Sequence, residues 1–308
     1  MSDQPPTTDK ASPSATLGRV AFELERQLAL TLAPGLYLVA TPIGHLADMT
    51  LRAIATLARA DIVYCEDTRH SRTLLAHYAI RAPLRPYHEH NAEEQRPRVL
   101  DDLAAGKRVA LISDAGTPLV SDPGFKLVRD ATAEGHAVIA IPGPSAALAA
   151  LSVAGLPTDA FFFAGFLPAK EGARRTRIAE LALIPATLVI FEAPTRIAAS
   201  LADLAAGLGN RDAALARELT KLHEDVRRAP LASLAESCVT DPPKGEMVIV
   251  VAPPGESEVS DASIEESLAT ALASLSIRDA ARVVADSLKV PRGRVYDLAL
   301  ALKRRDQD

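Results

Sequence analysis

The sequence predicts an α/β fold of two αβ domains, followed by a small helical module. The chain has 308 residues, of which 48% are hydrophobic, so it can bury a large core. From residue 35 onward, apolar β-branched runs alternate with helical patterns, which is typical of a mostly parallel sheet. After Pro157 the alternation changes to strands with only two or three helices between them. We therefore predict an N-terminal α/β domain at 35–156 and a mixed α/β domain at 157–253.

In the first domain, each predicted strand is a short apolar run, and a helical pattern follows it. The strands are expected at 36–41, 61–67, 108–113 and 137–143. The helices are expected at 51–60, 69–78, 123–134 and 145–155. Strands that are apolar on both sides imply that helices cover both faces of the sheet.

The rest of the chain is predicted from composition and spacing. The second domain is expected to hold strands at 161–167, 187–193, 213–219 and 245–253. Residues 254–262 are predicted to be a linker, and residues 263–308 a helical module of the helix-turn-helix type. The Pro/Ser/Thr-rich start of the chain predicts a disordered tail over 1–34, which runs into a short amphipathic stretch around VAFELERQL.

Charge, cysteine content and hydropathy narrow the classes of protein. A net charge of −5 argues against a protein that coats nucleic acid by charge alone, but it allows a local basic patch. The two cysteines, Cys65 and Cys238, lie far apart in apolar stretches, which argues against a disulfide framework or a cysteine metal site. No apolar run reaches the roughly 18–20 residues of a membrane span, and the N-terminus lacks the apolar core of a secretory signal. We expect a cytoplasmic protein without a membrane partner.

The stretch SDAGTPLVSDPG, residues 113–124, stands between a predicted strand and the next predicted helix. Gly116 and Gly124 allow the backbone to approach a ligand above the strand end, where open α/β sheets bind their ligands. The simpler interpretation is a turn in which Ser121 or Asp122 caps the helix. Loops of similar composition follow three other predicted strands, at 40–50, 141–147 and 191–196. Because four such loops would meet at one sheet edge, the sequence favours a cleft there.

Nine blocks occur in a characteristic order along the chain. They are TPIGHLADMTLRA, EDTRHSRTLL, YHEHN, SDAGTPLVSDPG, IPGPSAALAALSVAGLPTD, GFLPAK, FEAPTR, ARELTKLHE and KGEMVIVV. In this order, over residues 35–253, they resemble the bacterial ribosomal RNA small subunit methyltransferase I family of the tetrapyrrole methylase superfamily. The C-terminal residues look like that family's helix-turn-helix module. The resemblance implies S-adenosylmethionine-dependent 2′-O-methylation of a cytidine ribose in the decoding region of the 16S rRNA of the 30S subunit.

By this resemblance, the cofactor S-adenosylmethionine lies in the cleft between the two domains. Small residues let backbone groups approach adenine and ribose, and apolar side chains supply a wall. The positions that match the superfamily's cofactor contacts are Pro42, Ile43, Asp114, Gly116, Thr117, Ser145, Ala146, Phe191, Ala216 and Met247. Asp114 could instead serve only as a cap. His45 and Thr195 depart from the family pattern, which has Asn and His there, and this leaves their contacts open.

A ribose hydroxyl is a poor nucleophile until it is deprotonated, so the implied reaction calls for a general base. The candidates are Glu66, Asp67, His88 and Glu218. Asp67 is slightly favoured, because it closes a predicted strand and the nearby Arg69 could hold it ionised. Glu66 and Asp67 could equally just begin the next helix. The spacing of His88 and His90 is compatible with a metal, but without a third ligand nearby no metal is predicted.

Basic and aromatic residues near the loop motifs are candidates for RNA contacts. They are Arg69, Arg72, Tyr87, His88, His90, Lys170, Arg174, Arg175, Arg177, Arg196 and Lys221. Cations would bind phosphates, and His88 or Tyr87 could stack on a base. The charged run at 170–177 could instead be a solvated helix face. In the C-terminal module, Lys289, Arg292 and Arg294 are expected to be exposed, either for RNA or for self-association.

The resemblance also implies a homodimer. Two other functions stay open: a tetrapyrrole C-methyltransferase of the same fold, and a non-catalytic RNA-binding assembly factor. The YHEHN block and the basic residues after GFLPAK favour the RNA enzyme, because a tetrapyrrole methylase needs no phosphate contacts.

Overall fold

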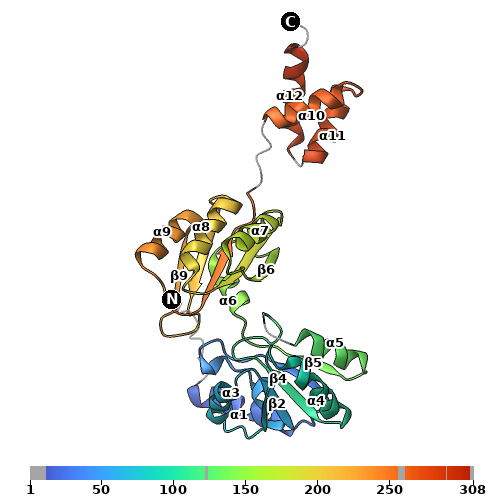
Figure 1. Ribbon diagram of the computed structural model, residues 1–308. Helices are drawn as coiled ribbons and strands as arrows, with labels where there is room; N and C mark the ends of the chain where they lie inside the picture. Colours follow the sequence, from blue (N-terminus) through green and yellow to red (C-terminus); the bar gives the residue numbers. More distant parts are fainter. Residues whose placement is uncertain (1–11, 122–123, 256–260, 289, 306–308) are drawn as a thin grey trace, which may run out of the picture. The chain divides into compact units, whose positions relative to one another are not determined.

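The computed structural model describes residues 12–121, 124–255, 261–288 and 290–305. Its backbone divides into two compact units, Met1–Pro253 and Pro254–Asp308. The first unit contains two five-stranded sheets, and the second contains helices (Figure 1). The predicted α/β fold with a C-terminal helical module is confirmed.

The first sheet is entirely parallel, as its alternation with helices predicts. Its strand order is β3-β2-β4-β1-β5, and every pair in it is parallel. The strands are β1 (Gly35–Val39), β2 (Ile62–Cys65), β3 (Leu84–Pro86), β4 (Arg108–Ile112) and β5 (Val138–Ile141). The short edge strand β3 was not predicted, because three residues give no readable apolar pattern.

Helices cover both faces of this sheet. They are α2 (Leu51–Arg59) and α3 (Thr68–His77) on one face, and α4 (Ala92–Ala104) and α5 (Phe125–Ala133) on the other. Successive strand residues point to opposite faces. Ala110 therefore packs in the cluster that contains Leu57 of α2, whereas Val109 packs with Val99 of α4.

The second sheet is mixed, as predicted. Its order is β6-β7-β10-β8-β9, in which β6 and β7 are parallel and the other pairs are antiparallel. The strands are β6 (Phe161–Phe166), β7 (Thr187–Glu192), β8 (Asp212–Arg217), β9 (Asp225–Pro230) and β10 (Met247–Val251). One face is covered by α7 (Glu171–Ala182), α8 (Ile197–Leu208) and α9 (Leu231–Thr240).

The other face of the second sheet is covered by α6 (Ala146–Ala154), which corrects the predicted domain assignment. The prediction placed this helix in the domain at 35–156, because it follows β5 along the chain. Ala150 and Ala154 instead pack with Val189 of β7 and Val250 of β10. Small side chains on α6 allow this close approach, so the helix packs with the second sheet and belongs to the second domain.

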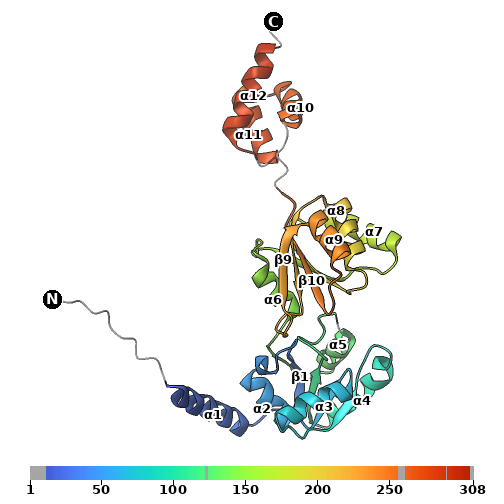
Figure 2. The same cartoon turned by 90° about the vertical axis from the view of Figure 1, so that its left-hand side faces the viewer.

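The N-terminal segment is also corrected, because α1 (Pro13–Ala29) replaces much of the predicted disordered tail over 1–34. Ser12 caps the helix by accepting a hydrogen bond from the Ala15 N–H at 3.3 Å, and Pro13 suits the first turn. The helix packs against α2 (Figure 2), and the Arg59 guanidinium donates a hydrogen bond to the Leu28 carbonyl. Residues 1–11 of the predicted tail lie outside the described residues.

The second unit is a three-helix module of α10 (Asp261–Leu272), α11 (Ile277–Leu288) and α12 (Arg292–Arg305). Ile264, Val284 and Val295 form its buried centre. Of the residues predicted to be exposed, Arg292 and Arg294 are exposed, Arg294 in an ion pair with Asp261 at 2.7 Å, and Lys289 lies outside the described residues. Over the described ranges, no helix has the length and apolarity that crossing a bilayer requires.

Candidate active site

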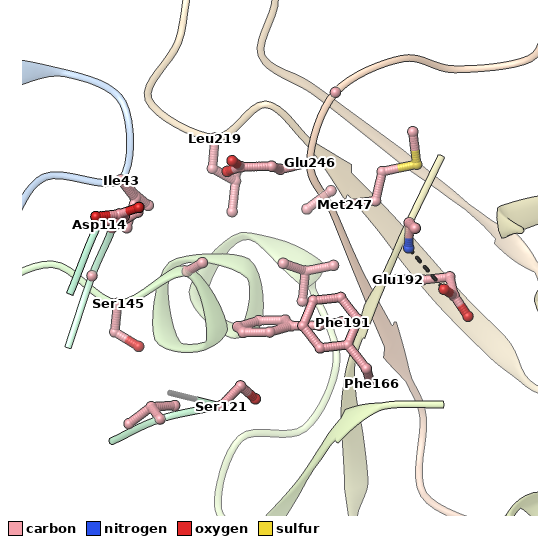
Figure 3. Close-up of a pocket in the computed structure, with 18 of the residues that line it drawn as sticks. Ile43, Asp114, Ser121, Ser145, Phe166, Phe191, Glu192, Leu219, Glu246 and Met247 are labelled. Carbon is pink, nitrogen blue, oxygen red and sulfur yellow. Dashed lines mark hydrogen bonds between the residues drawn. The ribbon is translucent and has the colours of Figure 1, made fainter. Parts of the chain in front are cut away.

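A pocket with a cavity volume of about 430 Å³ lies within the first unit, between loops of the two sheets (Figure 3). Nine of the ten positions predicted to contact the cofactor line it: Ile43, Asp114, Gly116, Thr117, Ser145, Ala146, Phe191, Ala216 and Met247. The tenth, Pro42, is buried and is not among the described lining residues. The four loops that the sequence singled out therefore all contribute to one concave site.

The loop after β4 is joined to the other two loops of the first sheet. Thr41 and Gly116 exchange backbone hydrogen bonds of 2.9 and 3.0 Å, and the Thr117 hydroxyl donates to the Pro144 carbonyl at 3.0 Å. Gly116 has φ +81°, and a Cβ there would lie 3.3 Å from Ile43 Cγ2, so both backbone and space favour glycine. These hydrogen bonds hold the loop in place as part of the pocket wall.

The simpler interpretation of this loop, a turn in which Ser121 or Asp122 caps the next helix, is wrong for Ser121. Helix α5 begins at Phe125 with Gly124 at its N-cap and has no side-chain cap hydrogen bond, so Ser121 does not cap it. Asp122 lies outside the described residues. Ser145, in contrast, does cap a helix, since its hydroxyl accepts from the Leu148 N–H at 3.5 Å at the start of α6. The pocket therefore meets the N-terminal end of α6.

Glu66 and Asp67 adopt different roles at the end of β2. Glu66 lines the pocket, and desolvation together with the charge of Asp114 raises the pKa of its carboxyl. Asp67 is the N-cap of α3: its Oδ1 accepts from the Arg69 N–H at 2.8 Å and its Oδ2 pairs with the Arg69 guanidinium at 3.1 Å. These bonds lower the pKa of Asp67. Of the two carboxylates, only Glu66 is among the described pocket-lining residues.

The other two candidate bases lie beside the pocket. The backbone N–H of His88 donates to Asn91 Oδ1 at 2.8 Å, and its buried Nδ1 has no hydrogen-bond partner among the described residues. Glu218 accepts from the Glu246 N–H and from Lys221 Nζ, both at 2.9 Å, and these bonds lower its pKa. Neither residue belongs to the described lining, so the geometry favours Glu66.

Four carboxylates line the pocket among the described residues, Glu66, Asp114, Glu192 and Glu246, and sequence reasoning missed Glu192 and Glu246. The side chain of Glu192 is fully buried and accepts a hydrogen bond from the Ala193 N–H at 2.7 Å (Figure 3). It also accepts one from Ser200 Oγ at 2.5 Å. It also pairs with Arg196 at 2.6 Å, which orders the FEAPTR loop. The neighbouring Thr195 is exposed and is not among the described lining residues. A charged residue at the end of an apolar strand was the signal that could have revealed Glu192.

The residues predicted to bind RNA are mostly engaged in ion pairs. Arg174 contradicts its prediction: its side chain is only 8% exposed and pairs with Asp203 at 2.6 Å, which Arg175 also binds at 2.9 Å. The other predicted contacts that are paired with carboxylates are Arg69, Arg177, Arg196 and Lys221. Three stay exposed without an ion pair among the described residues: Arg72, His90 and Lys170. Tyr87 is buried against Tyr64, so it is not available for base stacking.

Within the described ranges, no three His, Cys, Asp or Glu side chains gather as a metal-binding group. His88 and His90 are neighbours, with ring centroids 6.1 Å apart.

The two-sheet fold and the pocket at its loops define the class of protein. Residues 35–235 match the family model of the tetrapyrrole (corrin/porphyrin) methylases, and residues 258–303 match that of the RsmI C-terminal HTH domain.

Two named relatives are both called ribosomal RNA small subunit methyltransferase I. That of Mesorhizobium japonicum is 51% identical over 277 residues, which cover 89% of this chain and 94% of the relative. That of Pseudomonas aeruginosa is 46% identical over 272 residues, covering 86% and 96%. The chain belongs to the ribosomal RNA small subunit methyltransferase I family and is a methyltransferase.

Solved structures with the same fold agree with this assignment. Uroporphyrin-III C-methyltransferase from Thermus thermophilus, in complex with S-adenosylhomocysteine, matches with a TM-score of 0.50 at 26% identity, over 70% of this chain and 96% of that chain. A diphthine synthase matches with a TM-score of 0.56 at 18% identity, over 70% and 89%, which bears on the fold alone. The fold class predicted from the sequence is thus shared by methyltransferases of known structure.

Proposed function

We propose that this protein transfers the methyl group of S-adenosylmethionine to the ribose 2′-hydroxyl of a cytidine in the decoding region of 16S rRNA. The observation that carries the proposal is one pocket that combines an apolar wall with a carboxylate, Glu66, whose pKa is raised. The names of the relatives in Mesorhizobium and Pseudomonas support the RNA substrate.

The pocket fits the cofactor in size and in chemistry. Its volume of about 430 Å³ lies in the range of small-molecule sites. Ala216 and Met247 give a buried apolar wall for the adenine. The backbone N–H and carbonyl of Gly116 are already bonded to Thr41, so polar contacts to the cofactor would come from other lining residues such as Asp114 and Thr117. When bound, S-adenosylmethionine supplies a methyl group on a cationic sulfonium, which the carboxylates of Asp114 and Glu66 would favour electrostatically.

Glu66 is the general base in this proposal. A raised pKa brings a carboxylate closer to the working pH, so that it accepts a proton more readily while it remains ionised. Asp67 is a weaker choice, since its carboxylate is held as the cap of α3 and its pKa is lowered. Holding the hydroxyl in line with the methyl group could supply roughly 7–11 kcal/mol of the barrier reduction.

The RNA phosphates are proposed to meet exposed cations near the pocket. Lys170 follows Phe166 by four residues, and Lys244 directly precedes the lining residue Gly245. Arg72 lies on α3, which starts beside Glu66. Among the described residues, none of these three cations is in an ion pair, so their charges are free for phosphate. We further propose that the enzyme acts in the cytoplasm on the 30S subunit, as a homodimer and without a metal.

A methyl-transfer assay on unmodified 30S particles from a strain that lacks this methylation tests the proposal. The protein, labelled S-adenosylmethionine and these particles are expected to give one new 2′-O-methyl group in the decoding region, located by mapping of 2′-O-methyl sites. Parallel reactions with a tetrapyrrole substrate test the C-methyltransferase alternative. A protein that binds RNA but does not bind S-adenosylmethionine in calorimetry would be a non-catalytic assembly factor.

A further inference from the structure

We propose that Phe166 is the platform on which the base of the acceptor nucleotide stacks while its ribose enters the pocket. This inference rests on the proposed function and deepens it, because it separates the part of the pocket that takes the nucleobase from the part that takes the cofactor.

The apolar lining of the pocket has a buried part and an exposed part. Ile43, Ala216 and Met247 are buried, with exposed fractions of 6%, 1% and 3%. Phe166 also lines the pocket, yet 55% of its surface is exposed. Ligand pockets are lined predominantly by hydrophobic and aromatic side chains, and this side chain is open to solvent. The pocket thus offers an apolar rim that is open to solvent.

A β-bulge places Phe166 on the pocket side of the sheet. In a regular strand, residues 163 and 166 would point to opposite faces. The register of β6 against β7 shifts between Phe163 and Gly165, so that Phe163 pairs with Val189 and Phe166 pairs with Phe191. Both phenylalanines therefore share the face of Val189 and Phe191. Gly165 has φ +68°, a left-handed backbone conformation that favours glycine and allows the bulge to form here.

The contacts of Phe166 fix its ring without covering it. Phe166 and Phe191 lie side by side in the pocket (Figure 3), with ring centroids 5.6 Å apart at an interplanar angle of 67°. Phe191 in turn contacts Phe163, with ring centroids 4.9 Å apart at 71°. In such an edge-to-face arrangement, the neighbour occupies at most one face of a ring. Together with the exposure of the side chain, this leaves one face of Phe166 free to stack.

A nucleobase fits this rim better than the cofactor does. Pockets bury most of the surface of a small-molecule ligand, which suits the buried wall of Ala216 and Met247. A nucleotide from a large RNA arrives from solvent, and proteins hold such splayed bases by stacking them on aromatic side chains. The carbon that carries the 2′-hydroxyl is bonded to the carbon that carries the base. Phe166 and Glu66 line the same pocket, so a base on Phe166 would put the ribose of its nucleotide at this pocket.

Single-turnover methylation of 30S particles at saturating S-adenosylmethionine tests this role. Phe166→Ala and Phe166→Leu are expected to lower the rate at subsaturating particles by about 5- to 100-fold, the effect of removing one base–aromatic stack. Phe166→Tyr keeps the ring and is expected to stay close to the parent. Phe161→Ala is the matched control, because Phe161 lies on the same strand, is 44% exposed and is not among the described pocket-lining residues. Calorimetry should show the same affinity for S-adenosylmethionine in all variants.

Particles that carry an abasic ribose at the acceptor position separate stacking from a structural role. The parent enzyme should lose as much rate on them as Phe166→Ala loses on normal particles, and Phe166→Ala should lose nothing more. Equal rates of the parent and Phe166→Ala on normal particles, additive losses in this cycle, or a weakened cofactor affinity in Phe166→Ala would each overturn the inference. A parent enzyme that does not methylate 30S particles at all overturns the proposed function itself, and the inference with it.

Discussion

Asp114 Oδ1 accepts a hydrogen bond from the backbone N–H of Asp67 at 3.0 Å, and this bond joins the loop after β4 to the end of β2. The same carboxylate lines the pocket next to Glu66, and its charge contributes to the raised pKa of Glu66. Asp114 therefore links the shape of the pocket to the basicity of its carboxylate, which makes it more than a local cap.

Asp114→Asn should shift the pH dependence of methylation to lower pH. The amide oxygen can still accept from the Asp67 N–H, but the negative charge that helps to raise the pKa of Glu66 is gone. Since the base acts when ionised, the rate rises with pH through the pKa of Glu66, and this rise should occur at lower pH in the variant. Single-turnover rates across pH measure the shift. An unchanged profile would mean that Glu66 is not the titrating base.

Asp114→Ala is the companion variant, because it removes both the charge and the acceptor. We expect it to weaken S-adenosylmethionine binding more than Asp114→Asn does, since the loop that Asp114 ties to Asp67 loses its anchor. The affinity is measured by calorimetry on folded protein. Equal affinities of the two variants would show that the hydrogen bond to Asp67 does not shape the pocket.

Glu66→Gln should lower the single-turnover rate by about 10²-fold or more while the binding of RNA and cofactor persists, because a base is needed only as the hydroxyl loses its proton. Asp67→Asn is the matched control, since asparagine is as good an N-cap as aspartate. Its rate should stay close to that of the parent, because Asp67 is a helix cap and not the base in this proposal. The opposite ranking of the two variants would return the role of base to Asp67, and a small effect in both would leave His88, Glu218 or solvent as the proton acceptor.

His45→Asn, which restores the residue usual in the family, should leave cofactor affinity and rate nearly unchanged. His45 Nδ1 accepts from the Ala47 N–H at 3.2 Å as the cap of the short 3₁₀ helix η1 (Leu46–Asp48), and an asparagine oxygen can do the same. Its backbone N–H donates to Thr220 Oγ1 at 3.0 Å in either case. Calorimetry and single-turnover rates check this. A several-fold change would show that the imidazole itself contacts a ligand.

The fold could largely be predicted because its strands are continuous apolar runs. β4 and β10 are buried along nearly their whole length, so their sequences contain almost no polar residue to obscure the pattern. The errors lie where the apolar pattern of a segment does not show which other element it packs against. Helix α6 is apolar and small, and nothing local indicates that it packs on the second sheet rather than the first. Helix α1 was missed because its Pro/Ser/Thr-rich start indicates disorder, whereas Ser12 and Pro13 form a helix start.

The site could be predicted only at the level of its loops. The loops after β1, β4 and β5 meet because these neighbouring parallel strands end at one edge of the first sheet, which follows from the order of the elements. The loop after β7 comes from the second sheet, so the prediction that all four loops meet at one sheet edge is wrong, although all four line the pocket. Which charges stay free depends on contacts between residues far apart in the sequence. The Arg174–Asp203 pair spans 29 positions and cannot be read from the basic run at 170–177. The pocket position of Phe166 depends on a one-residue bulge, which no local pattern reveals.

Arg174→Ala should destabilise the fold by about 3 kcal/mol, since it leaves the buried Asp203 carboxylate with fewer partners. Burial alone would raise the pKa of Asp203, but hydrogen bonds from Arg175 and Arg174 outweigh it and lower that pKa. The pair therefore stabilises above the unfolded pKa of Asp203, and its contribution is lost as pH falls through the folded value. Urea unfolding at neutral and acidic pH should show a smaller difference between parent and variant in acid. A variant as stable as the parent would show that the pair with Asp203 does not stabilise the fold, and Arg174 would again be a candidate for phosphate contacts.

Replacing Arg72, Lys170 and Lys244 together with alanine should weaken RNA binding and flatten its salt dependence. Each phosphate contact that is lost lowers the slope of log K against log salt by roughly 0.7–0.9, so three contacts would remove about two units or more. Cofactor affinity should not change, because none of these side chains is among the described residues that line the pocket.

The matched control is the triple variant Arg26→Ala, Arg98→Ala and Arg177→Ala, whose cations each pair with a carboxylate on their own helix. It removes the same net charge, so it separates direct contact from the general field of the protein. If both triple variants lower the slope equally, the free cations are not phosphate contacts, and the RNA is bound elsewhere on the protein.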